Sequence, residues 1–259
     1  MADDVTEGAG RVAVVTGACR GMGLAISERL GRMGYRVVML DILADAVTAA
    51  SATLNRGGLD TTALTFDVGD EADRSTLRQR MGPEDFDRIA VLVNNAGISP
   101  KHDGRALPPS QIPFEEWEQV MAVNITGPFR MCQICLPPMR AAGWGRIVNI
   151  SSRGGRSPAN VAGAHYVTTK SGMLGMTRSV AKEVAAEGIT VNTICPGRIA
   201  TPMSDGSPPE VLERVMATIP VNRFGQPSEI AALVGFLASR EAGFITGAVH
   251  DINGGSLMI

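Results

Sequence analysis

The stretch "RVAVVTGACRGMG" (residues 11–23) decides the fold class, because it joins a strand pattern to a glycine-rich turn and then to a helix. Residues 11–16 form a β-branched apolar run. The segment "GMGLAISERLGRMG" (21–34) places apolar residues at the i, i+3 and i+4 spacing of a helix. A buried strand that runs through glycines into a helix is typical of an α/β sheet.

The same alternation continues to the end of the chain. Apolar runs predict further strands at 35–41, 61–67, 88–95, 145–151, 189–195 and 248–252, and helical patterns fall at 42–58, near 70–82, at roughly 114–142, about 163–187 and around 227–239. Strands that are apolar throughout indicate a parallel sheet covered on both faces. We therefore predict an α/β fold: one doubly wound, Rossmann-type domain over 11–259, with about seven parallel strands and helices on both faces. Residues 1–10 are expected to form a flexible leader.

Composition excludes several classes of protein. The 259 residues carry 24 Lys and Arg against 26 Asp and Glu, for a net charge of −2, and no basic stripe indicates nucleic-acid binding. No apolar run reaches the roughly 18 to 20 residues of a membrane-spanning helix. The acidic start "MADDVTEGAG" lacks the pattern of a secretory signal, so we expect a cytoplasmic protein without membrane contact.

Cys132 and Cys135 form a CxxC pattern, which invites a redox or metal-site interpretation. They lie in "FRMCQICLPPM", an apolar helical segment, and neither a second CxxC nor a nearby His completes a ligand set. We interpret them as small buried hydrophobic residues and expect no metal site.

The first strand–helix junction has the features of a phosphate site. Gly17, Gly21 and Gly23 allow a tight turn in which backbone N–H groups approach a pyrophosphate at the helix N-terminus. Asp41 ends the second strand, where a carboxylate bonds the ribose hydroxyls of an adenosine and repels a 2′-phosphate. Arg20 has the opposite preference, because a cation pairs with a 2′-phosphate. We favour Asp41, and so NAD, with NADP possible.

Two further strand ends face the same edge of the predicted sheet. Asp67 closes the third strand, where it either accepts from an adenine amino group or caps the helix that starts near Asp70; the sequence favours neither. The motif "NNAG" closes the fourth strand, and its Asn94 and Gly97 either hold a cofactor groove open or form an ordinary Asx turn.

The stretch "HYVTTKSG" (165–172) places Tyr166 and Lys170 on one helix face. A phenol is a poor base at neutral pH, but a neighbouring ammonium favours phenolate, as does a positively charged nicotinamide ring. Moving its pKa to about 7 requires roughly 4 kcal/mol. Ser151 and Ser152 end the preceding strand, where a hydroxyl can bond a substrate oxygen.

Together these motifs resemble the classical short-chain dehydrogenase/reductase family. The matching pieces are "TGACRGMG", Asp41, Asp67, "NNAG", Asn124 in "MAVNITG", "NISS", "YVTTK", "PGRIATPM" and "ITGAVHDINGG", in the family's order over about 11–255. The ordered set is specific, although each motif is short.

The resemblance implies roles for single residues. Tyr166 would be the general acid/base, Lys170 would lower its pKa and bind the nicotinamide ribose, Ser152 would orient the substrate oxygen, and Asn124 would hold a proton-relaying water. The cofactor positions implied in addition are Met22, Val68, Ala96, Pro196, Gly197, Ile199 and Thr201, the last two at the carboxamide. A substrate lid over about 202–220 is expected, as is a homotetramer whose interface uses the helices at 114–142 and 163–187.

One departure concerns the spacing of serine and tyrosine. Ser152 lies 14 residues before Tyr166, one more than is usual in the family, which we interpret as an insertion within 153–165. We keep Ser152 over Ser151 because it sits at the expected strand end. His165 is not taken as a second base, since neighbouring helical residues point in different directions.

The implied activity is NAD(P)-dependent interconversion of a secondary alcohol and a ketone. Polyols, sugars and small hydroxy compounds rank slightly ahead of a 3-oxoacyl thioester on acyl carrier protein, because Asp41 favours NAD and no basic patch suits an acidic carrier. The alternative from another class is a non-catalytic dinucleotide-binding sensor. It is disfavoured because all four catalytic positions are filled.

Overall fold

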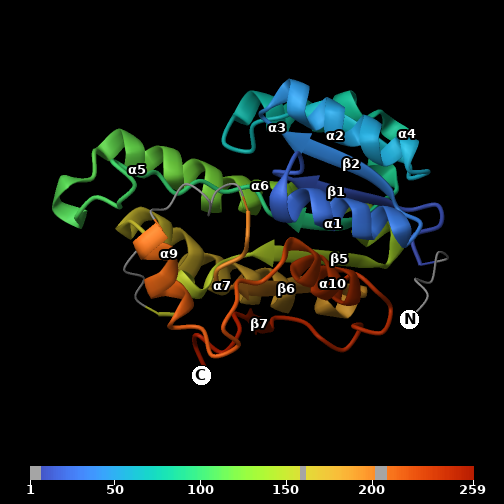
Figure 1. The fold of residues 1–259 in the computed structure, drawn as a ribbon. Coiled ribbons are helices and arrows are strands. Elements are labelled where there is room, and N and C mark those ends of the chain that lie inside the picture. The colour runs from blue at the N-terminus through green and yellow to red at the C-terminus, as the bar shows by residue number, and fades with distance from the viewer. Residues whose placement is uncertain (1–6, 158–161, 202–208) are drawn as a thin grey trace.

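The computed structural model describes residues 7–157, 162–201 and 209–259, and it shows a parallel sheet between two layers of helices (Figure 1). The sheet has seven strands in the order β3-β2-β1-β4-β5-β6-β7, and every neighbouring pair is parallel. The strands are β1 (Val12–Thr16), β2 (Arg36–Asp41), β3 (Thr61–Thr65), β4 (Ile89–Asn94), β5 (Gly145–Ile150), β6 (Ile189–Pro196) and β7 (Val249–Ile252). The predicted doubly wound α/β fold is confirmed.

Helices connect the strands as right-handed crossovers require. Their bounds are α1 (Gly21–Arg32), α2 (Ala44–Arg56), α3 (Glu71–Met81), α4 (Pro83–Asp87), α5 (Phe114–Met121), α6 (Gly127–Ala142), α7 (Ala164–Val184), α9 (Pro209–Met216) and α10 (Pro227–Leu237). The 3₁₀ turns are η1 (Pro109–Gln111), η3 (Arg153–Gly155) and η4 (Ala185–Glu187), and a π-helical turn, η2 (Ala122–Thr126), joins α5 to α6. Within the described residues, none of these helices combines the length and apolarity needed to cross a bilayer.

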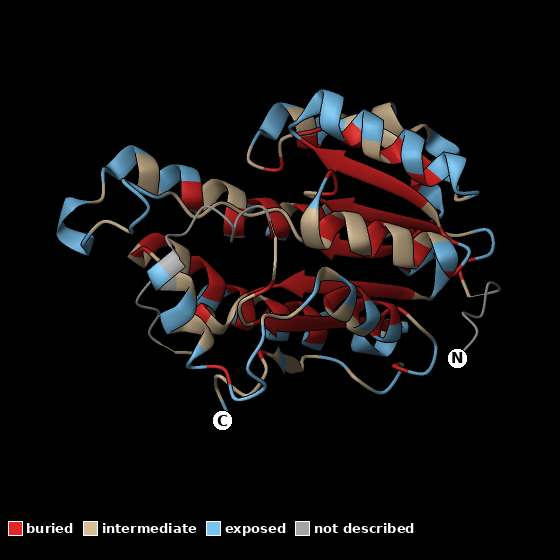
Figure 2. Cartoon of the chain, in the orientation of Figure 1, coloured by how far each residue is buried: buried red, intermediate tan, exposed pale blue. Residues whose placement is uncertain are grey.

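The core forms two apolar layers, one on each face of the sheet. Alternate residues of a strand face opposite sides, so Val15 packs toward α1 and α10, whereas Val14 packs toward α6 and α7. The central strands are therefore buried along their length, as Figure 2 shows. This double burial explains why the strands read as continuous apolar runs.

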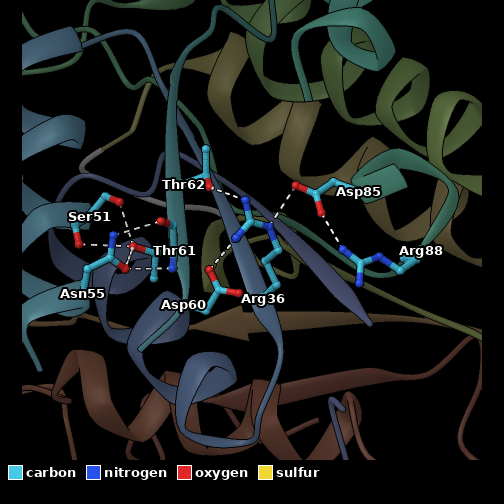
Figure 3. Close-up of polar contacts among 8 residues, drawn as sticks. All are labelled: Arg36, Ser51, Asn55, Asp60, Thr61, Thr62, Asp85 and Arg88. Carbon is cyan, nitrogen blue, oxygen red and sulfur yellow. Dashed lines mark hydrogen bonds and ion pairs between the residues drawn. The ribbon is translucent and has the colours of Figure 1, made fainter. Parts of the chain in front are cut away.

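The strand order reverses between β1 and β4, which opens a crevice beyond the carboxyl ends of these strands. The amino end of the sheet is closed by ion pairs instead. Arg36, at the start of β2, bonds Asp60, Thr62 and Asp85, and Asp85 also pairs with Arg88 (Figure 3). The two ends of the sheet therefore differ. Ion pairs and hydrogen bonds tie the elements together at the amino end, and the carboxyl end carries the crevice in which the candidate site lies.

The structure departs from the predicted elements in several places. β3 ends at Thr65, so Asp67 lies beyond the strand instead of closing it. The helical region at 114–142 is interrupted by η2, and α4 and α9 were not predicted. Of the expected lid, 202–208 lie outside the described residues, and α9 occupies 209–216.

Part of the predicted leader packs on the domain. Residues 7–10 form a turn, and the N–H of Gly8 donates to the Met33 carbonyl over 2.9 Å. Gly8 is buried against Tyr35, where a Cβ would lie 2.2 Å from the Tyr35 nitrogen. The remaining leader, residues 1–6, is outside the described part of the chain.

Candidate active site

The glycine loop between β1 and α1 has a backbone that other residues adopt poorly. Gly17 and Gly21 have φ of 64° and 55°. A Cβ on Gly23 would lie 2.0 Å from the Gly17 carbonyl oxygen, so the helix can approach the strand this closely only with glycine there. Arg20 is the N-cap of α1 and makes no side-chain cap bond, which leaves the helix N-terminus suited to an anion.

Asp41 is fixed at the carboxyl end of β2, next to this loop. Its Oδ2 accepts from the Cys19 N–H over 3.0 Å, and its Oδ1 accepts from the Leu43 N–H over 3.1 Å. Burial and the hydrogen bond to Asp41 raise the pKa of Cys19 to about 11, so this thiol stays protonated. The carboxylate of Asp41 therefore lies where the sequence predicts an adenosine ribose.

The end of β4 is tied to the glycine loop by Asn95, which the sequence analysis did not single out. Its Nδ2 donates to the carbonyls of Thr16 and Gly17, both over 2.9 Å, and the N–H groups of Asn95 and Ala96 donate to Thr16 Oγ1. The neighbouring Asn94 points into the core, where its Nδ2 donates to Asn149 Oδ1 over 2.8 Å. The Asn94 side chain therefore faces the opposite side of the strand from Asn95, and the predicted part of Asn94 in the cofactor site stays a prediction.

Asp67 lies past β3 and forms a local turn, in which its Oδ1 accepts from the Gly69 N–H over 2.7 Å. The N-cap of α3 is Asp70, whose side chain accepts from the Ala72 N–H over 2.9 Å. Of the two readings of Asp67, the helix cap is wrong, and adenine recognition stays a prediction. Val68 is buried beside it, and its carbonyl accepts from Arg74.

The segment after β6 closes the opposite side of the crevice. Pro196 ends the strand, and Gly197 donates to the Ile252 carbonyl over 2.9 Å. Ile199 forms an isolated bridge with Gly225. A Cβ on Gly21 would lie 3.4 Å from Thr201 Cγ2, so the two ends of the predicted cofactor site, 180 residues apart, meet across the crevice.

Lys170 and Tyr166 lie on the first turns of α7, as predicted. The Lys170 side chain is buried, and its Nζ donates to the Ile150 carbonyl over 2.8 Å and lies 5.7 Å from the centroid of the Tyr166 ring. Burial lowers the pKa of Lys170 to about 8.

Burial also raises the pKa of Tyr166, against the opposing effect of a hydrogen bond with Ser152. Burial is the largest effect on this phenol, so the lowering of its pKa by Lys170 that the resemblance implies stays a prediction. The phenol stays protonated at neutral pH.

The two serines at the end of β5 have separate roles. The Ser151 hydroxyl is buried and donates to the Lys170 backbone carbonyl over 2.7 Å. Ser152 is the N-cap of η3, its Oγ accepts from the Gly154 N–H over 3.0 Å, and its side chain lowers the pKa of Tyr166 against the effect of burial. The geometry therefore favours Ser152 as the substrate-facing hydroxyl despite the longer spacing.

Asn124 lies fully buried in the π-helical turn. Its side chain makes a two-way bond with the Ile98 backbone, accepting from the N–H over 2.8 Å and donating to the carbonyl over 2.9 Å. A Cβ on Gly97 would lie 3.4 Å from both Asn124 Oδ1 and Lys170 Nζ, so Gly97, Asn124 and Lys170 converge. π-Turns within α-helices are frequent at functional sites.

Comparison with known proteins gives the family. A family model described as enoyl-(acyl carrier protein) reductase matches residues 17–256. FabG of Pseudomonas aeruginosa, a 3-oxoacyl-[acyl-carrier-protein] reductase, is 38% identical over 253 residues, which are 96% of this chain and 98% of the relative. The acetoacetyl-CoA reductase of Shinella zoogloeoides is 42% identical over 254 residues, 96% of this chain and 99% of the relative. A crystal structure of a 3-oxoacyl-[acyl-carrier protein] reductase from Brucella melitensis with bound NAD is 35% identical, with a TM-score of 0.90 over 98% of this chain and 93% of that chain. The chain belongs to the short-chain dehydrogenase/reductase family.

The chain is accordingly an oxidoreductase that acts on CH–OH and keto groups, as the resemblance implies. The CxxC is not part of this short-chain dehydrogenase site. Cys132 and Cys135 are free and buried in α6, and burial raises the pKa of Cys132 to about 12, as expected for small hydrophobic residues. In the described part of the chain, no group of three or more His, Cys, Asp and Glu side chains is placed to hold a metal ion.

Proposed function

We propose that this short-chain dehydrogenase/reductase is an NAD(P)-dependent ketoreductase whose substrates are 3-oxoacyl thioesters. The observation that carries the proposal is geometric: Lys170 Nζ lies 5.7 Å from the centroid of the Tyr166 ring, and Gly97 leaves the space beside that ammonium open, while burial raises the pKa of the phenol. A phenol that stays protonated at neutral pH is the form that a ketone reductase needs, because the alkoxide formed on reduction must receive a proton.

The residues present fit a nicotinamide dinucleotide. The helix N-terminus of α1 is uncapped by any side chain, and Gly97 leaves open the space next to Lys170 that a Cβ would occupy. When bound, the nicotinamide supplies or accepts hydride at its C4 atom. Lys170, whose buried ammonium donates to Ile150, has further N–H donors for the ribose hydroxyls.

The chain's own residues then handle the substrate oxygen and its proton. Ser152 donates to the carbonyl oxygen and holds it in line with Tyr166, which transfers its phenolic proton to that oxygen during reduction. Lys170 stabilises the negative charge left on Tyr166, and its effect is strong because both groups lie in a low-dielectric site. Asn124 keeps the Ile98 segment in place beside Lys170. A water held by Asn124, as the resemblance implies, would return the proton.

Asp41 supports NAD as the preferred cofactor. Its carboxylate is positioned at the end of β2 by two backbone N–H groups, so a 2′-phosphate brought to this point would meet a fixed negative charge. Arg20 is exposed on the neighbouring turn and is the residue that would allow NADP. The Brucella melitensis reductase was solved with NAD.

The relatives favour a thioester over the polyol or sugar that the sequence analysis ranks slightly higher. Both curated relatives described above reduce a 3-oxoacyl thioester according to their names. A polyol or other small secondary alcohol remains the second candidate, because Asp41 favours NAD and NAD-dependent enzymes commonly run toward oxidation.

We further propose a cytoplasmic homotetramer. Phe114 of α5 and Phe129 of α6 expose 66% and 44% of their surface, so the helices that the sequence analysis assigns to a subunit interface present large apolar groups. Subunit contact would cover them.

Absorbance at 340 nm tests the activity directly. Acetoacetyl-CoA with NADH or NADPH is one substrate pair, and a panel of polyols and secondary alcohols with NAD or NADP is the other. The proposal predicts faster oxidation of NADH with acetoacetyl-CoA than reduction of NAD with any polyol. Activity confined to the polyols would reject the thioester, and cofactor binding without any turnover would indicate a sensor.

A further inference from the structure

A carboxylate bonded to two imidazoles lies next to the catalytic helix. Glu116 of α5 has Oε1 2.8 Å from His165 Nε2 and Oε2 2.7 Å from His102 Nε2. We propose that Glu116 is a positioning residue that couples the segment 99–113, which follows Ile98 and its bonds to Asn124, to the helical turn of Tyr166 through these two histidines. The proposal rests on the proposed function, in which Tyr166 exchanges a proton with the substrate.

The contact with His165 reaches the backbone of the catalytic tyrosine. His165 is 2% exposed, and its Nδ1 accepts from the Tyr166 N–H over 2.7 Å. The Tyr166 N–H is one of the donors at the start of α7 that lack a helical partner, and the N-cap Gly163 offers no side chain for it. Because Nδ1 is the acceptor, Nε2 carries the proton and donates to Glu116. Glu116 thereby fixes the imidazole that holds the first turn of α7.

Glu116 also bonds His102, which lies in the segment 99–113. His102 and Arg105 bond each other through both backbone N–H groups, over 2.8 and 3.0 Å, across a tight turn. Asp103 and Gly104 occupy the turn with φ of 50° and 75°, which is typical of a type I′ hairpin turn. The turn lies before α5 in the chain, and the His102 side chain is 44% exposed there. Its bond to Glu116 therefore links the turn to α5 through side chains.

The chemistry of the three groups requires a carboxylate in the middle. The hydrogen bond from His165 outweighs burial and holds the pKa of Glu116 below its usual range, so the group accepts bonds on both oxygens. An ionised carboxylate has no donor, so each imidazole must donate from Nε2. Movement of the turn at His102 is thus transmitted through the planar carboxylate of Glu116 to His165, and from there to the Tyr166 backbone.

Hydrogen exchange followed by mass spectrometry tests the coupling without requiring turnover. In Glu116→Ala, we expect faster exchange both in peptides covering 99–107 and in peptides covering 164–170. Glu115→Ala is the matched control, because Glu115 also lies in the first turn of α5 and is exposed. Unchanged exchange in Glu116→Ala, or release of the 99–107 peptides alone, would overturn the proposal.

Kinetics with acetoacetyl-CoA and NADH separate positioning from simple destabilisation. His102→Ala should raise KM roughly threefold or more with kcat nearly unchanged, whereas Glu116→Ala should also lower kcat. In the Glu116→Ala background, His102→Ala should have no further effect on KM, because its partner is gone. Full additivity of the two substitutions would overturn the coupling. Absence of turnover in the wild type would reject the proposed function only, since the exchange data then decide the coupling.

Discussion

Replacing Lys170 by Met should make folding stability depend on pH in a different way from the wild type. Lys170 is 3% exposed, and burial lowers the pKa of its ammonium from 10.5 to about 8. This difference corresponds to about 3 kcal/mol at about 1.36 kcal/mol per pH unit. Between pH 8 and 10.5 the unfolded chain binds more protons at Lys170 than the folded chain does, so this residue makes stability rise with pH.

The size of the effect follows from the same two pKa values. Below pH 8, burial of the charged Lys170 lowers the free energy of unfolding by the full amount of about 3 kcal/mol. Near pH 9.5 this destabilisation is about 1 kcal/mol. Between pH 7 and pH 9.5, the free energy of unfolding of the wild type should therefore rise by about 2 kcal/mol relative to that of Lys170→Met. At pH 7 the variant should be inactive yet nearly as stable as the wild type, because loss of the buried charge is offset by the unpaired Ile150 carbonyl, at about 1 to 3 kcal/mol.

Urea unfolding followed by far-UV circular dichroism measures this difference. Both proteins are unfolded at one concentration at pH 7 and pH 9.5, so that other titrating groups cancel in the comparison. Lys182→Met is the control, because Lys182 is an exposed lysine on the same helix and should show no such change. A stability difference between the wild type and Lys170→Met that is equal at the two pH values would refute the reasoning.

Three further predictions concern the cofactor, the glycine loop and assembly. Asp41→Ala should move the ratio of kcat/KM toward NADP(H), and a wild type that already prefers NADP(H) would contradict the reading of Asp41. Gly23→Ala should lower Tm by several degrees and weaken cofactor binding, because its Cβ would lie 2.0 Å from the Gly17 carbonyl oxygen, whereas Gly175→Ala, with nothing within 4 Å, should do neither. Multi-angle light scattering should give the mass of a tetramer, and a monomer would count against the interface assigned to α5, α6 and α7.

The sheet could be predicted from the sequence because its strands are buried on both faces. Runs such as 11–16 and 189–195 are apolar without interruption, and the structure confirms a strand at each. The end of β3 was less well defined. The residues Phe66 and Asp67 continue its apolar and strand-end pattern, but the ladder with β2 stops at Thr65. That shift of two residues turned a predicted strand end into a local turn.

The placement of the predicted catalytic pair on one helix face could be read from the sequence, and its surroundings could not. Tyr166 and Lys170 are local to one helix, so their spacing reveals their shared face. Choosing between Asn94 and Asn95 required the direction of each side chain at the end of β4, which the motif alone does not give. Glu116 lies 49 residues from His165, and only the packing of α5 on α7 brings them together.

The electrostatic state of Tyr166 could not be read from the motif either. The neighbouring ammonium suggests a lowered pKa, but desolvation of the phenol is an effect of the folded chain and has the opposite sign. The sequence identified the groups, and their burial decided which protonation state is stable.

Turnover by Tyr166→Phe, measured with cofactor affinity on the same sample, tests the central claim most directly. The substitution removes one hydroxyl and leaves the ring that packs in α7. If the phenol is the proton donor and acceptor, kcat should fall by about 100-fold or more, while the Kd for NADH stays within about a factor of two. A variant that retains most of its turnover would contradict the account, whatever its affinity for the cofactor.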